Sequence, residues 1–388
     1  MSWCSCVFLG IFIVSIHPAI YLYKNLNFPT LQYIKKRFRR SWNYSFLYAG
    51  SLFLLIQVLV ACNQNHSQNN DTMIWISNGD VKAGILPDVG GRVVYLSLKG
   101  KENILTSDST LWNESSAARP EIASTTPFKA YNGHIVWLGP QAGWWTQQNE
   151  DTAKRNRADV WPPDPYLIYG GYTVLSQSDS SLVMQGPESK YSGVQLTKKI
   201  SINENGEVYF QVTAKNIREE PISWDLWLNT RLNGYATCFI PLADTTEMRE
   251  DAVNNEKKIK PEFSVSQGYF TLYPSEPPQG KEMRVGKYFI YPDNNYMAAF
   301  YNDQFLFFSF PLPEKEEIHP EQAAIEIYNI TTHKPEDALL EMELHSPYKT
   351  LQPGEEISTE LTWYLSEADT NLSPEEKISL VNKFRDKY

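Results

Sequence analysis

KKISINENGEVYFQV, residues 198–212, decides the fold class that we predict for this chain. Two runs of alternating apolar and polar residues flank Asn205-Gly206, and an Asn-Gly pair supplies the positive φ angles of a tight turn between antiparallel strands. A second hairpin is predicted in YMAAFYNDQFLFFSF, residues 296–310, with its turn at Asn302-Asp303. Alternation of this kind is typical of strands that bury one face.

The same pattern continues through most of the chain. From Met73 onward, alternating or β-branched runs are separated by Gly, Pro, Asn and Asp, for example in VKAGILP (81–87), YLIYGGYTVL (166–175) and LLEMELH (339–345). Helices do not alternate with these runs, which excludes a doubly wound α/β fold and predicts an all-β sandwich or barrel formed by one domain over 73–388.

One helix is predicted, at the C-terminus. Ser373 has the features of an N-cap, Pro374 occupies the first helical position, and Glu376 completes a capping box. An apolar stripe of Ile378, Val381 and Phe384 follows. We therefore expect a short helix that packs against the β structure by this stripe.

The N-terminal 61 residues have the order of an export signal. A basic cluster, KKRFRR at 35–40, precedes the apolar run FLYAGSLFLLIQVLVA at 46–61, and Cys62 follows. Leu59-Val60-Ala61-Cys62 resembles the lipobox of bacterial lipoproteins, in which the cysteine is acylated. The polar stretch after Cys62 predicts a flexible tether over 62–72. The alternative is an ordinary transmembrane anchor. An upstream apolar stretch at 7–23 is either a first membrane segment or an upstream region that was translated in error.

Charge and cysteine content narrow the function. Removal of residues 1–61 takes away six of the 35 basic residues and none of the 45 acidic ones, so 29 basic residues face 45 acidic ones. Such a surface repels phosphate backbones, so we expect no nucleic-acid partner. With Cys62 lipidated, Cys238 has no partner for a disulfide. The localisation that we predict is the cell envelope, with a lipid anchor in the membrane and the domain facing the periplasm or the cell surface.

Residues 131–145, YNGHIVWLGPQAGWW, and WPPDP at 161–165 hold four tryptophans among Gly, Pro, Gln and Asn. Indole buries a large apolar area and keeps one N–H donor, so it suits either a core or a ligand surface that is partly wet. The stretch alone leaves both interpretations open.

ILPDVGGRVVYLSLKGKENIL, residues 85–105, resembles the opening of galactose mutarotase-like proteins. Further matches are NGHIVWLGPQ, WPPDP, YSGVQLTKKISI, TAKNIREEPISWDLWLNT, HPEQAAIEIYN and ELHSPYKTLQPGEE, which resemble a less studied branch of that superfamily, a domain family of unknown function. The resemblance covers nearly all of 73–365. It implies a β-supersandwich, two large antiparallel sheets packed face to face, whose concave face binds carbohydrate.

A saccharide ligand gives the tryptophan stretch a role. Sugar sites combine an aromatic platform for the C–H face of the ring with planar polar partners for its hydroxyls. We therefore predict contacts from Asn132 and Asp164 and from Trp144, Trp145 and Trp161, whose neighbours are polar or proline. Trp137 lies in the apolar IVWL run, and core packing and ligand contact are equally open for it.

The resemblance also implies an acid–base pair, because in mutarotases a glutamate removes the anomeric proton while a histidine protonates the ring oxygen. Alternation turns Glu326 away from the apolar face of AAIEIYN and groups Glu343 with Glu341 and His345 in LLEMELH. Glu326, Glu343 and His134 are the catalytic candidates. The alternative for the carboxylates is a solvated strand face, and for His134 a buried core position.

One departure from the mutarotase pattern puts catalysis in doubt. The central strand reads WDLWLNTRLNG, residues 224–234, without the expected histidine. Alternation groups Asp225, Trp227, Asn229 and Arg231, which could grip hydroxyls or a carboxylate but cannot replace an imidazole. Of these, Trp227, Asn229 and Arg231 are predicted ligand contacts, and Arg92 is a further one.

Binding of a saccharide is therefore the first functional prediction, and we expect the protein to be a monomer. A mutarotase, an epimerase or another carbohydrate-active enzyme is the alternative, and a scaffold for protein contacts is a third possibility. The six histidines show no metal-ligand spacing, and we find no nucleophile elbow or phosphate-binding loop, so no cofactor is expected.

Overall fold

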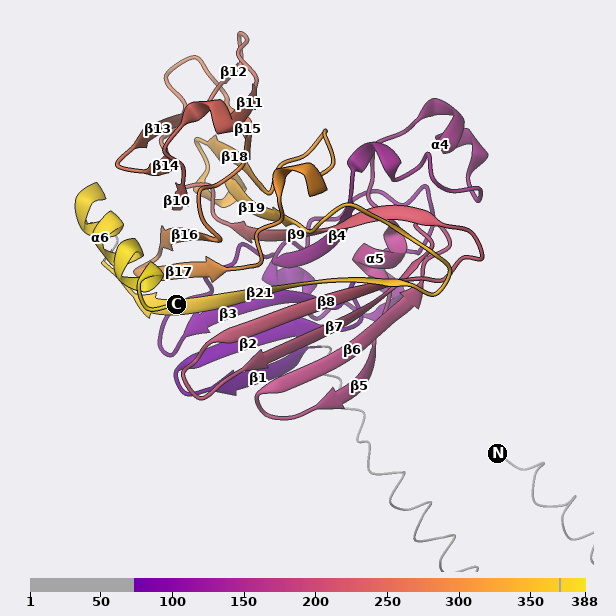
Figure 1. The fold of residues 1–388 in the computed structure, drawn as a ribbon. Coiled ribbons are helices and arrows are strands. Elements are labelled where there is room, and N and C mark those ends of the chain that lie inside the picture. The colour runs from indigo at the N-terminus through magenta and orange to yellow at the C-terminus, as the bar shows by residue number, and fades with distance from the viewer. Residues whose placement is uncertain (1–72, 370) are drawn as a thin grey trace, which may run out of the picture. The chain divides into compact units, whose positions relative to one another are not determined.

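The computed structural model describes residues 73–369 and 371–388, and this part of the chain is built from two large β-sheets (Figure 1). All strand pairings except that of β12 with β15 are antiparallel. The predicted all-β, two-sheet antiparallel architecture is confirmed. The predicted signal segment, tether and lipidation site at Cys62 lie outside the described residues.

The first sheet has eleven strands and carries the site described below. In spatial order its strands are β1 (Ile74–Asn78), β2 (Val81–Leu86), β3 (Arg92–Leu98), β4 (His134–Gly139), β9 (Ile222–Leu232), β19 (Leu339–His345), β18 (Ile325–Thr332), β15 (Met283–Ile290) and β11 (Met248–Ala252), with β12 (Lys258–Ile259) paired to β15 and β20 (Lys349–Leu351) paired to β9.

The second sheet has ten strands and packs against the first through a shared apolar core. In spatial order its strands are β13 (Glu262–Ser266), β14 (Tyr269–Tyr273), β10 (Thr237–Pro241), β16 (Tyr296–Tyr301), β17 (Gln304–Ser309), β21 (Glu356–Glu367), β8 (Val208–Asn216), β7 (Val194–Ile202), β6 (Ser181–Glu188) and β5 (Thr173–Gln177). The facing side chains of both sheets are Val, Ile, Leu, Met and aromatic residues, which suit a pleated, buried surface.

In the part of the chain that the structure describes, three short α-helices accompany the sheets: α4 (Thr152–Arg157), α5 (Pro165–Tyr169) and α6 (Pro374–Arg385). The prediction of α6 is confirmed, including the Ser373 N-cap and its capping box with Glu376. Ile378 and Val381 of α6 pack on Phe305 and Phe307, so this helix covers part of the outer face of the second sheet (Figure 1). Among the described residues, no helix combines the length and the apolar character needed to span a membrane.

Both predicted hairpins are present, but their turns differ from each other. Asn302 and Asp303 each have positive φ, at 57° and 54°, which is the geometry of a two-residue turn that matches strand twist. In the other hairpin, only Gly206 has positive φ, and Asn203 accepts a hydrogen bond from the Gly206 amide to form a longer turn. The prediction that both Asn205 and Gly206 supply positive φ was therefore wrong.

The predicted strand over 166–175 was also wrong in its first half. Residues Pro165–Tyr169 form helix α5, and β5 begins only at Thr173. The Asp164 carboxylate accepts a hydrogen bond from the Tyr166 amide as the N-cap, and Pro165 takes the first helical position. This local capping outweighs the strand preference of the Tyr, Leu and Ile residues that follow.

Candidate functional site

Strand β9 separates its side chains between the core and the outer face of the first sheet. Leu226, Leu228 and Thr230 point between the sheets, while the odd-numbered residues of the strand point outward. The outward residues are Asp225, Trp227, Asn229 and Arg231, the group that alternation predicts. All four are nevertheless buried, because neighbouring strands and loops cover them.

The residues that pair with β9 across the neighbouring strands extend this outer face. Asn229 pairs with Glu343, which in turn pairs with Glu326 of β18. Arg231 pairs with Glu341 in the adjacent row. Because paired residues in a sheet project to the same side, polar groups from β9, β19 and β18 form one continuous surface.

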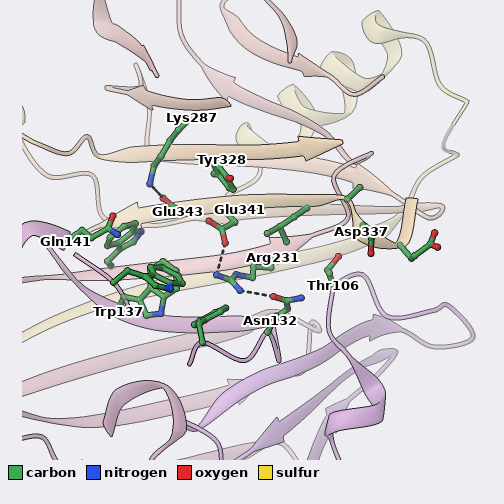
Figure 2. A pocket seen from close by; sticks show the side chains of 17 residues that line it. Thr106, Asn132, Trp137, Gln141, Arg231, Lys287, Tyr328, Asp337, Glu341 and Glu343 are labelled. Carbon is green, nitrogen blue, oxygen red and sulfur yellow. Dashed lines mark hydrogen bonds and ion pairs between the residues drawn. The ribbon is translucent and has the colours of Figure 1, made fainter. Parts of the chain in front are cut away.

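A pocket of about 570 Å³ opens on this outer face (Figure 2). Its floor comes from β4, β9, β19, β18 and β15, and its walls from the loops before and after β4 and from the Pro335–Asp337 turn. The residues that line it are Thr106, Phe128, Ala130, Asn132, Trp137, Gln141, Trp161, Trp227, Arg231, Lys287, Tyr328, Glu336, Asp337, Ala338, Leu339, Glu341 and Glu343.

Arg231 lies in the middle of the pocket floor, and each of its three side-chain nitrogens has a partner among its neighbours. Its Nη2 is 2.7 Å from Glu341 Oε1, its Nη1 donates to Asn132 Oδ1 at 2.7 Å, and its Nε donates to Asn229 Oδ1 at 3.3 Å. Asn132 has φ of 55°, and a Cβ at the following Gly133 would lie 2.3 Å from the Val93 carbonyl oxygen. Glycine is therefore required at 133 to hold the Asn132 side chain against Arg231.

Lys287, from β15, places its ammonium between two buried carboxylates. Its Nζ is 2.6 Å from Glu326 Oε2 and 2.9 Å from Glu343 Oε2. Burial disfavours the charged lysine, but the two carboxylates outweigh this effect and raise its pKa. The same ammonium lies 4.7 Å from the centre of the Trp227 ring, which adds a cation–π contact.

Further ion pairs lie behind Lys287, on the side away from the pocket. His345 Nε2 is 3.4 Å from Glu326 Oε1, and His345 Nδ1 is 3.0 Å from Asp225 Oδ1. Burial disfavours the imidazolium, yet Glu326 and Asp225 raise the pKa of His345 to about 9. Burial likewise disfavours ionised Glu326, but His345 and Lys287 lower its pKa to about 2. Both groups are therefore charged at neutral pH.

Glu343 differs from Glu326, because the pKa of Glu343 is raised and not lowered. Its side chain is buried, and burial together with the nearby charges of Glu341 and Glu326 raises its pKa to about 8, although Lys287 opposes the shift. Asn229 Nδ2 donates to Glu343 Oε1 at 2.9 Å. A protonated carboxyl group at the wall of a pocket can donate a hydrogen bond to a ligand as well as accept one.

Three of these groups could be considered as metal ligands. Within the described residues, ligand atoms of Glu326, Glu343 and His345 lie within 4.8 Å of one another. The Lys287 ammonium already contacts both carboxylates and supplies the positive charge that a cation would bring. We therefore assign no metal to this cluster.

Aromatic side chains form the apolar part of the pocket. Trp161 is 46% exposed, and its ring contacts Phe128 at 5.0 Å and Trp137 at 6.3 Å between centroids. The Arg231 guanidinium lies 5.3 Å from the centre of the Trp137 ring. The pocket thus places indole surfaces beside a hydrogen-bonding floor, the combination that a ligand with one apolar and one polar face requires.

The predicted proton donor His134 does not reach the pocket. His134 lies on β4 three residues before Trp137, so the two side chains point to opposite faces of the sheet. Its ring packs edge-on against Phe210 and Trp363 of the second sheet, and its Nδ1 is 2.9 Å from Thr230 Oγ1. Burial lowers its pKa well below the usual value, so it is a neutral core histidine.

The structure places the four tryptophans of this stretch in two different environments. Trp144 and Trp145 are buried in the core, where their indole N–H groups donate to the carbonyl oxygens of Leu138 and Pro162. Trp137, for which core packing and contact were equally open, lines the pocket together with Trp161. The turn at Gln141–Gly143 directs the following tryptophans inward, which polar neighbours in the sequence do not reveal.

Arg92 and Asp164 also lie away from the pocket and have structural partners. Arg92 is completely buried and donates to the carbonyl oxygens of Val89, Asn132 and Ile168. Burial lowers its pKa to about 9. Asp164 caps α5 and accepts from the Ser192 amide at 3.1 Å. These contacts leave neither residue facing a ligand.

The other predicted residues are brought together. Asn132, Trp161, Trp227, Arg231 and Glu343 line the pocket, while Asn229 and Glu326 lie directly behind it and hold Glu343 and Lys287. Sequence reasoning missed the pocket residues Phe128, Lys287 and Tyr328, among others. The period-two pattern of MRVGKYFI, residues 283–290, marks the Lys287 strand but does not show which strand lies beside it.

These features define a class: a two-sheet antiparallel β-sandwich protein with an aromatic and charged pocket on the outer face of one sheet. The sequence profile of the family described as "Domain of unknown function (DUF4380)" matches residues 72–366, and the chain belongs to this family. No curated protein matches the chain.

Similar solved structures include several mutarotase-like proteins. A putative aldose 1-epimerase from Escherichia coli K12 shares 11% identity over 76% of this chain and 99% of its own, with a TM-score of 0.45. A galactose mutarotase-like protein from Clostridium acetobutylicum shares 15% identity over 76% and 95% of the two chains, with a TM-score of 0.46. A GalM/aldose epimerase homologue from C. elegans shares 10% identity over 76% and 99%, with a TM-score of 0.42. Similarity at this level concerns the arrangement of strands and not the activity.

Proposed function

We propose that this protein binds a saccharide in the pocket on the outer face of the first sheet. The observation that carries the proposal is the pairing of the half-exposed Trp161 indole, with the buried Trp137 beside it, with the hydrogen-bonding floor around Arg231. A pyranose ring has an apolar C–H face and a rim of hydroxyls that both donate and accept hydrogen bonds. The pocket offers a counterpart to each.

Titration calorimetry on the purified full-length protein with a panel of mono- and oligosaccharides tests this proposal. We expect saturable binding of at least one saccharide, and the binding enthalpy should disappear when Arg231 is replaced by Met. If no saccharide binds, the proposal is wrong, and a scaffold function for protein contacts takes its place.

Catalysis on the bound sugar is the second candidate. The observation that favours it is the cluster of Glu343, Lys287, Glu326 and His345, because buried ionisable groups with shifted pKa values concentrate at catalytic sites. Glu343 would exchange a proton with the anomeric hydroxyl or the ring oxygen in a mutarotase- or epimerase-type reaction. Since His134 lies in the core, the acid–base pair predicted with it is not part of this candidate.

Magnetisation transfer between the α and β anomers of free sugars, followed by proton NMR, separates the two candidates. Acceleration by the wild-type protein that disappears in Glu343→Gln, while sugar affinity persists, would establish catalysis. Line broadening without acceleration across the panel would support binding alone.

We further propose that the domain is held at the cell envelope by a lipid on Cys62. The support is the order of basic cluster, apolar run and cysteine in the sequence. Metabolic labelling with palmitate, compared between the wild type and Cys62→Ser, tests the anchor. Absence of label from wild-type protein in the membrane fraction would contradict it.

A further inference from the structure

The positive charges in the wall of the pocket are already neutralised. Arg231 is 2.7 Å from Glu341, and Lys287 lies between Glu326 and Glu343 at 2.6 and 2.9 Å. An Arg or Lys that recognises an anion must present free N–H donors and uncompensated charge to it. Neither cation of the pocket carries uncompensated charge.

The acidic groups at one end of the pocket, in contrast, have no partner in the described part of the chain that neutralises their charge. Glu336 and Asp337 lie in the Pro335–Asp337 turn and line the pocket, and Asp337 lies near Thr106 (Figure 2). Both side chains are exposed, and neither forms an ion pair or a side-chain hydrogen bond with another described residue. Of the residues that line the pocket, four are acidic and two are basic, and with Glu343 protonated below its pKa of about 8 three negative charges still face two positive ones.

The aromatic lining of the pocket also favours a positively charged ligand. Phe128, Trp137, Trp161, Trp227 and Tyr328 all line the pocket. Arg231 lies over Phe128 and Trp137, and Lys287 lies over Trp227, so among the described pocket residues Trp161 and Tyr328 are the rings without a cation of the protein over them. The negative faces of aromatic rings attract cations, and this attraction adds to that of nearby carboxylates. A ligand that carries a positive charge is therefore favoured twice, and an anion is repelled by the same groups.

We infer that the saccharide taken by this pocket carries a basic amino group, and that Glu336 and Asp337 select it over neutral and acidic sugars. This inference rests on the proposed saccharide binding and names its ligand class. The amine would lie at the Thr106 end of the pocket, where the acidic groups are not compensated, and the sugar ring would contact the indoles.

The test compares sugars that differ in charge and little else. Glucosamine, N-acetylglucosamine, glucose and glucuronate, with the corresponding galactose series, are titrated into full-length protein at low ionic strength and at about pH 6.5, where a sugar amine is protonated. We expect the amine to bind about tenfold more tightly than its neutral counterparts, and the uronate more weakly than both. Added salt should reduce the difference, because the acidic groups are exposed to solvent.

A pair of variants assigns the preference to its residues. In Glu336→Gln/Asp337→Asn the preference for the amine should fall to about twofold or less, while affinity for the neutral sugar stays within about twofold of the wild type. Glu204→Gln/Glu219→Gln removes two exposed acidic groups outside the pocket and should keep the preference. Since all four side chains are exposed, both variants are expected to fold.

The outcomes separate this inference from the proposal beneath it. Equal affinity for amine and neutral sugar, or tighter binding of the uronate, overturns the inference while saccharide binding stands. A preference that survives in Glu336→Gln/Asp337→Asn overturns the role of the two acidic residues. Binding of no sugar at all contradicts the proposed function itself.

Discussion

The two faces of strand β9 belong to different environments, although their residues alternate along eleven positions. The inward face, with Leu226 and Leu228, packs in an apolar core shared with the second sheet. The outward face, with Asn229 and Arg231, is equally buried but holds amide and ionic groups that form ion pairs and hydrogen bonds. Burial by itself therefore does not distinguish core from site in this protein.

The two faces differ in how a substitution on each would destabilise the protein. On the inward face a substitution leaves a cavity, whose cost follows the volume removed. On the outward face a substitution leaves another charge without its partner in a region of low dielectric. The four predictions that follow test this contrast, beginning with the largest expected effect.

Replacement of Glu326 by Ala should cause the largest loss of stability. It leaves Lys287 and His345, both charged at neutral pH, without their shared carboxylate, and the loss of one partner from a buried pair costs about 3–5 kcal/mol. Urea unfolding followed by tryptophan fluorescence measures the change. Glu262→Ala is the matched control, because that carboxylate pairs with Arg284 at 2.7 Å but is exposed, and it should cost about 0–1 kcal/mol. Similar losses for both variants would contradict the contrast.

Stability should also fall as the pH rises above neutrality. The folded-state pKa of His345 is about 9 against an ordinary value of 6.5, so its stabilising charge is fully present below 6.5 and is lost as the pH rises through 9. Glu343, with a pKa of about 8, contributes in the same direction between 4.5 and 8. Unfolding free energies measured from pH 5 to 9 test this, and His345→Gln should flatten the slope. An unchanged slope in that variant would show that a group other than His345 causes the pH dependence of stability.

His134→Ala should affect stability and leave the pocket unaffected. Loss of the ring between Phe210 and Trp363 creates a cavity, for which we expect a cost of about 2–4 kcal/mol. The affinity for any saccharide that binds the wild type should remain within about twofold when measured well below the melting temperature. A selective loss of affinity or catalysis at unchanged stability would show that His134 takes part in the site.

Trp161→Ala should show the reverse pattern and the smallest change in stability. The side chain is 46% exposed at the pocket rim, so unfolding should change by less than about 1 kcal/mol, while saccharide affinity should fall about tenfold. Trp75→Ala is a suitable control, since this tryptophan is 40% exposed on β1 and does not line the pocket. An equal loss of affinity in both variants would count against stacking at Trp161.

The strands were the most predictable part of the fold. Period-two patterns locate β7, β8, β16 and β17, and the capping box locates α6, because these signals are local. The error at 166–175 has a local cause as well, since the Asp164-Pro165 cap was present in the sequence but was outweighed in the prediction by the strand-forming residues after it. The order of strands within each sheet depends on pairings between distant segments, which a single sequence does not show.

The site was predictable only where one strand supplied several residues. Alternation along β9 and β19 groups Asn229 with Arg231 and Glu341 with Glu343. The same rule applied to β4 separates His134 from Trp137, so both could not belong to one site. Lys287 could not be predicted, because its position between Glu326 and Glu343 follows from the pairing of β15 with β18.

The register of β4 with β9 has a kinetic consequence. His134 and Thr230, which pair across these two strands, are 96 residues apart, and Lys287 reaches the pocket on the other face of the sheet from farther along the chain. Contacts so distant in sequence form late, since each requires closure of a long loop before it contributes stability. Partly folded chains therefore lack the pocket, and the first appearance of ligand affinity during refolding reports the moment when the central strands of the sheet have joined.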